Sequence, residues 1–221
     1  MAAGDDARFL EAGRLIFAGE ADFKWAADKF ESLPPIGDIE IAFAGRSNVG
    51  KSSLINRLAH HQGLAKSSAS PGKTRLINHF LFEMPPSTSM YLVDLPGYGY
   101  ARASKKEIEA WNVMMKRYLR ERPNLVCVLQ LIDSRLSPQK ADLDFANQMG
   151  EWGLPLVLVF TKTDKDSMVQ ASRNADRYGK AMLETWESLP PTFMSSATNG
   201  RGRNEILKFL MDCSKQWAQK G

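Results

Sequence analysis

The chain has 221 residues, 43% of them hydrophobic and 24% charged, with a formal net charge of +4. This composition excludes a disordered chain, and no apolar run approaches the roughly 20 residues that cross a bilayer. The first 14 residues are too charged for a secretory signal, and the two cysteines, Cys127 and Cys213, lack ligand spacing. We therefore expect a cytoplasmic protein with buried free thiols. The mild basicity permits an RNA partner without requiring one.

The predicted elements alternate along the chain. Residues 1–37 are expected to form an N-terminal extension, closed by Pro34, Pro35 and Gly37, before a domain over residues 38–221. Apolar runs predict strands over residues 39–44, 76–84, 90–93, 125–132, 156–160 and 192–194. Amphipathic stretches predict helices over residues 51–60, 104–121, 138–151, 167–187 and 203–218. This pattern favours a doubly wound α/β fold, with a mostly parallel six-stranded sheet, one antiparallel strand and helices on both faces.

A phosphate-binding motif follows the first of these strands. Ligands of such sheets bind beyond the carboxyl ends of the strands. Residues 45–52, GRSNVGKS, match the pattern G-x-x-x-x-G-K-[ST] between a strand and a helix. The loop can turn its N–H groups toward a phosphate, Lys51 can reach the β and γ phosphates, and the Ser52 hydroxyl can bind Mg²⁺. The motif predicts a P-loop NTPase, although a chance glycine-rich turn is the alternative and the base stays open.

Two further loops have the residues of nucleotide switches. Residues 70–74, SPGKT, precede the second strand, where Thr74 can offer a hydroxyl to Mg²⁺ and an N–H to the γ-phosphate, as in switch I. Residues 94–97, DLPG, end the third strand, where Asp94 can hold Mg²⁺ through water and the Gly97 N–H can meet the γ-phosphate. Residues 94–104 are the expected second switch. Each loop by itself is also compatible with an ordinary surface turn.

The last two loops distinguish GTP from ATP. Residues 161–165, TKTDK, follow a very apolar strand. The Asp164 carboxylate can accept both N1–H and the 2-amino group of guanine, whereas adenine would leave it unpaired. Lys162 can lay its alkyl stem over the base, and a backbone N–H within residues 195–197 can donate to guanine O6. A solvated charge cluster is the alternative, but five such loops in this order favour a guanine-nucleotide site.

These loops together resemble one known family. Residues 45–53 (GRSNVGKSS), 71–74 (PGKT), 94–101 (DLPGYGYA) and 161–165 (TKTDK) are similar to those of the EngB (YihA/YsxC) GTPases of bacteria. The resemblance begins at about Leu33 and continues to the C-terminus. It implies a single-domain GTPase that binds GTP and GDP, assists assembly of the large ribosomal subunit and is needed for normal cell division and septation.

The resemblance also implies the roles of individual residues. Catalytic roles would fall to Lys51, Thr74 and Gly97, and Mg²⁺ would be held by Ser52, Thr74 and Asp94. The expected GTP-binding residues are Gly45, Arg46, Ser47, Asn48, Val49, Gly50, Lys51, Ser52, Gly72, Lys73, Thr74, Arg75, Leu76, Asp94, Leu95, Pro96, Gly97, Thr161, Lys162, Thr163, Asp164, Ser195, Ser196 and Ala197. The register of the last loop is open by one residue, because the family's Phe-Ser-Ser appears here with Met194 inserted.

The sequence lacks one residue that many small GTPases use in catalysis. Many small GTPases place a glutamine after the Asp-x-x-Gly segment to orient the attacking water, and here Tyr98 stands in that position. A phenol is a poor candidate for this role and is free to point away from the phosphates. We expect slow intrinsic hydrolysis, accelerated by K⁺ held near Asn48 or by a ribosomal partner. For Asn48, a role as a turn residue is the alternative.

Several weaker features have structural interpretations. Large apolar residues at helical spacing between residues 111 and 118 favour core packing, and the cations between residues 105 and 122 favour a solvated face over an RNA contact. His60, His61 and His79 lack metal or triad spacing, so surface or loop positions are expected.

Two classes of function therefore compete. The first is an enzyme acting as a timed switch on the large ribosomal subunit or its RNA, with no membrane or DNA partner. The second is a nucleotide-gated protein-binding module that acts in division and hydrolyses GTP incidentally. Salt-sensitive binding to RNA would favour the first. An ATPase of similar fold is a third possibility, against which Asp164 argues.

Overall fold

The protein is built on one central sheet. A computed structural model describes residues 21–65, 76–84, 88–98 and 105–219. The seven strands lie in the order β1-β3-β4-β2-β5-β6-β7. They are β1 (Ala21–Ala27), β2 (Ile39–Gly45), β3 (Ile77–Met84), β4 (Thr88–Asp94), β5 (Leu125–Asp133), β6 (Leu156–Thr161) and β7 (Thr192–Met194). Only β3 runs against the others in this sheet, since its pairings with β1 and β4 are antiparallel and the remaining pairings are parallel. The predicted α/β class and the single antiparallel strand are confirmed.

The prediction of six strands is wrong, because β1 adds a seventh. This strand lies within residues 1–37 and pairs with β3 along the edge of the sheet. Its alternation of polar residues with Phe23 and Trp25 is a strand pattern. Both aromatic residues are partly exposed, because β1 is an edge strand. The predicted boundary at Pro34 and Pro35 follows β1, although β1 belongs to the same sheet as the strands after the prolines.

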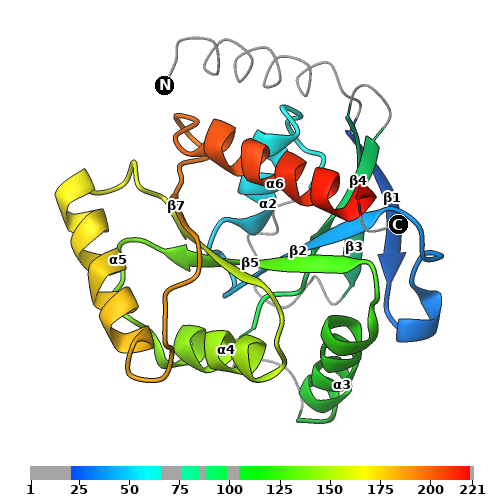
Figure 1. Ribbon diagram of the computed structural model, residues 1–221, viewed down its shortest axis with the longest axis horizontal. Coiled ribbons are helices and arrows are strands. Elements are labelled where there is room, and N and C mark those ends of the chain that lie inside the picture. Colours follow the sequence, from blue (N-terminus) through cyan, green and yellow to red (C-terminus); the bar gives the residue numbers. More distant parts are fainter. Residues whose placement is uncertain (1–20, 66–75, 85–87, 99–104, 220–221) are drawn as a thin grey trace.

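Helices cover both faces of the sheet, as predicted. They are α2 (Lys51–Leu58), α3 (Lys105–Glu121), α4 (Lys140–Glu151), α5 (Met168–Met182) and α6 (Arg203–Ala218), with a short 3-10 helix η1 (Phe30–Ser32). Figure 1 shows α2 and α6 on one side of the sheet and α3 and α4 on the other. Helix α5 ends before the predicted residue 187, because Thr185 and Trp186 turn toward Asn147 of α4 and hydrogen-bond to its side chain. Among the described residues, no helix is both long and apolar enough to cross a bilayer.

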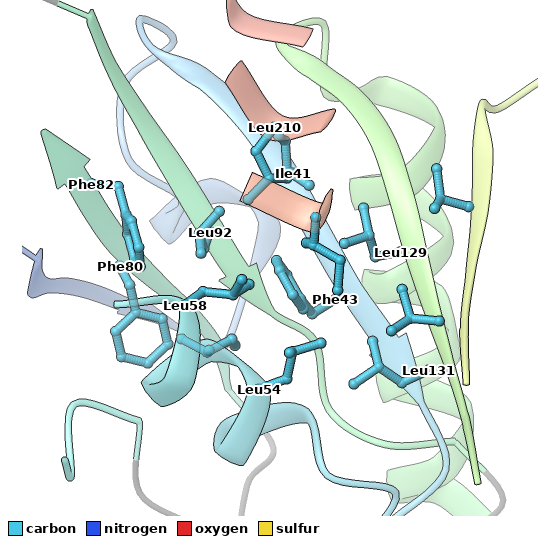
Figure 2. Packing of buried hydrophobic residues seen from close by; sticks show 14 of the residues in the cluster. Ile41, Phe43, Leu54, Leu58, Phe80, Phe82, Leu92, Leu129, Leu131 and Leu210 are labelled. Carbon is cyan, nitrogen blue, oxygen red and sulfur yellow. The ribbon is translucent and has the colours of Figure 1, made fainter. Parts of the chain in front are cut away.

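The alternation of strand residues builds two apolar layers. In β2, Ile41 and Phe43 pack toward α2 and α6, whereas Ala42 and Ala44 pack toward α3 and α4. Figure 2 shows the first layer, in which Leu210 of α6 lies over Ile41. Burying each large apolar side chain stabilises the fold by about 2 kcal/mol, so the two layers hold β2 in place. This packing fixes β2 relative to the helices on both faces, and with it the carboxyl end of β2, where the P-loop begins.

A buried polar cluster lies at the opposite end of β2. Glu40 accepts hydrogen bonds from the Tyr118 hydroxyl at 2.9 Å, from Nη2 of Arg122 at 2.6 Å and from Nδ2 of Asn124 at 3.3 Å. Nε2 of His79 lies 3.6 Å from the same carboxylate. The expectation of a surface or loop position is wrong for His79, which is fully buried on β3 against α3. The expectation of a solvated position is also wrong for Arg122, which is buried because its positive charge pairs with the buried carboxylate of Glu40.

Candidate functional site

The P-loop joins β2 to α2 with little room for side chains. A Cβ on Gly45 would lie 2.8 Å from the Leu131 carbonyl oxygen, so only glycine fits where the strand ends. The backbone then passes through left-handed conformations at Asn48 (φ 61°) and Gly50 (φ 111°) before α2 begins at Lys51. Such a path turns successive N–H groups inward, and the start of α2 adds the positive end of its dipole. The loop is shaped for an anion.

A hydroxyl and a carboxylate meet beside this loop. Oγ of Ser52 donates to Oδ2 of Asp94 at 3.2 Å, which brings the first turn of α2 to the end of β4. Asp94 is 6% exposed, and its Oδ1 atom has no hydrogen-bond partner among the described residues. Burial raises the pKa of Asp94, although Lys51 and Ser52 oppose the shift. Because a buried carboxylate oxygen without a partner is costly, and because these oxygen donors suit Mg²⁺, the residues fit the expected metal.

The segment after Asp94 lies against the P-loop. The Leu95 N–H donates to the Phe43 carbonyl at 3.0 Å, and the Tyr98 N–H donates to the Gly45 carbonyl at 3.2 Å. Between them, a Cβ on Gly97 would lie only 2.9 Å from the Ser47 backbone nitrogen. The Gly97 backbone is therefore in close contact with the loop that receives the phosphates.

The partly buried Tyr98 side chain lies between the sheet and α4, packed against the core of the domain. Its hydroxyl donates to Oδ1 of Asp142 at 2.9 Å and accepts from Nε2 of Gln130 at 2.9 Å. The ring stacks on Phe145, with centroids 4.7 Å apart. Sequence reasoning missed Gln130 and Asp142, although a glutamine inside the apolar run of β5 was a signal. The phenol is thus not available to orient water.

The base-side loop is attached to the P-loop. Oγ1 of Thr161 donates to the Val49 carbonyl at 2.7 Å. Nζ of Lys162 donates to the Asn48 carbonyl at 2.6 Å and to Oδ2 of Asp133 at 2.9 Å, which fixes the direction of its alkyl stem. Although burial opposes it, hydrogen bonding from Arg135 and Lys162 lowers the pKa of Asp133 to about 2. Asp133 at the end of β5 is a further residue that the sequence analysis did not identify.

Within residues 195–197, two of the three backbone N–H groups have acceptors among the described residues. Oγ of Ser196 donates to Oδ1 of Asp164 at 2.6 Å, and this bond helps to hold the pKa of Asp164 below its usual range. The Ser195 N–H donates to the Phe160 carbonyl and the Ser196 N–H to the Arg201 carbonyl, so both are occupied. Among the described residues the Ala197 N–H has no such acceptor, which points to Ala197 where the register was open.

These loops enclose a cavity of about 570 Å³, a size suited to a small ligand. Its walls include Gly50, Lys162, Asp164 and Ala197. The lining also includes residues at the end of α2 and just after it, which the sequence analysis did not assign to the site. These residues are Asn56, Arg57, His60, His61, Gln62 and Gly63.

Most of the expected nucleotide-binding residues therefore lie along one edge of the sheet. Residues 45–52, 94–97, 161–164 and 195–197 are brought together by the contacts above. Leu76 is exposed next to β3. Gly72, Lys73, Thr74 and Arg75 lie outside the described residues, and so does the expected contribution of Thr74 to catalysis and metal binding.

The sequence matches known proteins along most of its length. The family described as 50S ribosome-binding GTPase matches residues 40–162, from β2 to Lys162. A probable GTP-binding protein EngB from Bacteroides thetaiotaomicron is 49% identical over 177 residues, which cover 80% of this chain and 86% of the relative. The corresponding protein from Cytophaga hutchinsonii is 42% identical over 198 residues, covering 90% and 98%. The chain belongs to the EngB family of GTP-binding proteins. As an EngB protein, it is a P-loop enzyme that binds and hydrolyses GTP.

Solved structures share the EngB fold at lower sequence identity. The crystal structure of a probable GTP-binding protein EngB superimposes with a TM-score of 0.62 at 20% identity, covering 80% of this chain and 99% of that one. Era from Aquifex aeolicus gives a TM-score of 0.63 at 22% identity, covering 81% and 57%. These likenesses support the fold assignment for this EngB chain.

Proposed function

We propose that this EngB protein is a Mg²⁺-dependent GTPase with a slow intrinsic rate that acts as a switch during assembly of the large ribosomal subunit. We further propose that it works in the cytoplasm and is needed for normal division and septation. The observation that carries the nucleotide part is the buried Asp94 carboxylate, which lies beside Ser52 and the P-loop with one oxygen unpaired. The description of the matching family supports the ribosomal part.

The phosphate end of the site supports a division of roles. The P-loop N–H groups and Lys51 bind the β and γ phosphates, and Ser52 and Asp94 hold Mg²⁺, the aspartate through water. When bound, Mg²⁺ neutralises charge on the phosphate oxygens. The Gly97 N–H donates to the γ-phosphate from its position against Ser47. Because the Tyr98 hydroxyl is engaged by Asp142 and Gln130, it does not replace the water-orienting glutamine, and hydrolysis is slow without help.

The base end supports guanine selectivity. Asp164 accepts from N1–H and from the 2-amino group, and the Ala197 N–H donates to O6. Lys162 covers one face of the base with its stem, because Asp133 and the Asn48 carbonyl hold its ammonium group. The left-handed Asn48 serves the turn, and we propose that it also helps to hold K⁺ against the phosphates.

Nucleotide titration tests the site. Labelled GDP, GTP and ATP are titrated against the wild type, Asp164→Ala and the control Asp176→Ala, an exposed carboxylate on α5, in Mg²⁺ buffer. Loss of two charge-assisted hydrogen bonds should weaken guanine binding by about 100-fold in Asp164→Ala, and the control should match the wild type. Comparison of hydrolysis in K⁺ and in Na⁺ tests the role of Asn48. Equal affinity of the wild type for ATP would contradict the assignment.

Sedimentation with purified large ribosomal subunits tests the partner. Binding should be stronger with a non-hydrolysable GTP analogue than with GDP, and it should weaken steeply as salt rises, because contacts with RNA phosphates release counterions. Absence of nucleotide-dependent binding would argue against the ribosomal role. Salt-insensitive binding to a protein partner would favour the alternative of a protein-binding module with incidental hydrolysis.

A further inference from the structure

The segment that carries Gly97 is anchored by the residue that follows it. Tyr98 occupies the place where a mobile water-orienting residue stands in many GTPases, but its hydroxyl is tied to two elements. It accepts from Gln130 of β5 and donates to Asp142 of α4, both at 2.9 Å. A hydrogen bond from a hydroxyl to a carboxylate is stronger than one between neutral groups. Tyr98 is therefore held in one orientation.

The two residues that hold Tyr98 also hold each other. Nε2 of Gln130 donates to the backbone carbonyl of Asp142 at 2.7 Å, so the three residues form a closed triangle. Gln130 is fully buried and Asp142 is 3% exposed. The stacked ring of Phe145 covers one face of the phenol. Breaking hydrogen bonds between groups buried this deeply costs free energy, so the triangle holds β5, α4 and Tyr98 in a fixed arrangement.

The triangle of Tyr98, Gln130 and Asp142, called the anchor below, restricts the position of the peptide group next to Gly97. On one side of Gly97, the Tyr98 N–H donates to the Gly45 carbonyl, and the Tyr98 side chain is fixed in the triangle. On the other side, Leu95 is bonded to β2. Gly97 is thus held at both ends, in close contact with Ser47.

We propose that Tyr98 is a positioning residue that, through Gln130 and Asp142, presets the Gly97 amide to receive the γ-phosphate. A preset donor avoids the loss of conformational freedom that a mobile segment undergoes on binding. The anchor therefore favours GTP over GDP, since only GTP has the group that this amide meets. The inference rests on the proposed contact between Gly97 and the γ-phosphate.

The test compares two tyrosines with the same kind of bond. Tyr98→Phe keeps the ring and removes the hydroxyl from Asp142, and Tyr118→Phe removes an equal 2.9 Å bond to Glu40 at the far end of the sheet. Affinities for GDP and for a non-hydrolysable GTP analogue are measured with kcat and KM for GTP. Tyr98→Phe should lose about threefold to tenfold in analogue affinity and in kcat, the effect of one hydrogen bond, with GDP affinity unchanged. Tyr118→Phe should leave the ratio of the two affinities at the wild-type value.

Three further variants separate the possible failures. Asp142→Asn keeps an acceptor oxygen but loses the charge, so it should shift the ratio less than Tyr98→Phe does. Phe145→Leu removes the stacking and should shift the ratio in the same direction as Tyr98→Phe. Gly97→Ala tests the amide itself, because its Cβ would displace the segment from Ser47. If Gly97→Ala lowers the ratio and Tyr98→Phe does not, the anchor is overturned and the γ-phosphate contact stands. If Gly97→Ala leaves the ratio unchanged, the proposed contact is overturned, and the anchor with it.

Discussion

Two buried carboxylates at opposite ends of the sheet have different surroundings. Glu40 lies at the start of β2 and is fully buried, and the fold supplies it with donors from Tyr118, Arg122 and Asn124. Asp94 lies at the end of β4 and is 6% exposed, and Ser52 is the donor that the described residues supply. The first carboxylate is satisfied by its own chain, whereas one oxygen of the second has no partner among the described residues. This difference supports a structural role for Glu40 and the proposed metal-binding role for Asp94.

The pKa values of the two groups shift in opposite directions. Burial alone would raise the pKa of Glu40, but His79 and Arg122 more than offset it and hold the pKa below its usual range. Burial raises the pKa of Asp94, and Lys51 and Ser52 offset it only in part. The fold therefore stabilises the charge of Glu40, whereas it stabilises the charge of Asp94 less than water would.

The largest expected effect follows from removing the partner of Glu40. Arg122→Met should lower the free energy of unfolding by about 3 kcal/mol, because a buried carboxylate loses its cation. Urea denaturation measures the change. The control is Arg117→Met, which removes a more exposed arginine paired with Glu31 and should cost much less, because solvent screens an exposed ion pair. Equal costs for the two variants would show that Glu40 does not depend on Arg122.

At the other end of the sheet, removing a charge should stabilise the protein. Asp94→Asn should raise the free energy of unfolding of nucleotide-free protein by about 1 kcal/mol, since it removes a buried negative charge with one oxygen unpartnered among the described residues. The same variant should lose the Mg²⁺-dependent gain in GTP affinity. Denaturation in EDTA and nucleotide titration with and without Mg²⁺ measure the two effects. A destabilised variant that still responds to Mg²⁺ would contradict the comparison.

The dependence of stability on pH should have opposite signs for the two carboxylates. The lowered pKa of Glu40 contributes stability above its unfolded value of about 4.3, and this contribution is lost as pH falls through the folded value. The raised pKa of Asp94 favours the folded state below its unfolded value of about 3.9, and this is lost as pH rises through the folded value. Urea midpoints of Glu40→Gln and Asp94→Asn relative to wild type, from pH 3.5 upward, should therefore change with opposite slopes. If the relative urea midpoints of the two variants changed with pH in the same direction, the proposed difference between Glu40 and Asp94 would be wrong.

The smallest expected effect concerns Asp133, a carboxylate that has donors from its own chain, as Glu40 has, and lies beside the candidate site, as Asp94 does. Asp133 is satisfied by Arg135 and Lys162, yet through Lys162 it borders the nucleotide cavity. Asp133→Asn should weaken GDP binding by about threefold, because Lys162 loses its charged partner and covers the base less firmly. Fluorescence titration measures this change, with the surface variant Asp144→Asn as control. An effect on unfolding without one on GDP would make Asp133 purely structural.

Tertiary structure decided what depends on contacts between distant parts of the chain. Glu40 and Arg122 are 82 residues apart, and Tyr98 and Asp142 are 44 apart, so no local pattern pairs them. His79 was placed at the surface by its lack of motif spacing, although β3 buries it. The same reason explains the missed β1, whose alternation has meaning only once β3 lies beside it.

The sequence by itself determined the class of fold and the order of the nucleotide loops. This was possible because each loop is a short local pattern at the end of an apolar strand. In residues 45–52, a glycine with no room for a Cβ, a left-handed turn and the start of a helix follow within eight positions. Only the folded chain could show which polar groups are satisfied, because hydrogen-bond partners are set by packing. It showed that Tyr98 bonds to Asp142 and that one oxygen of Asp94 has no partner among the described residues, which is the basis for proposing Asp94 as a metal ligand.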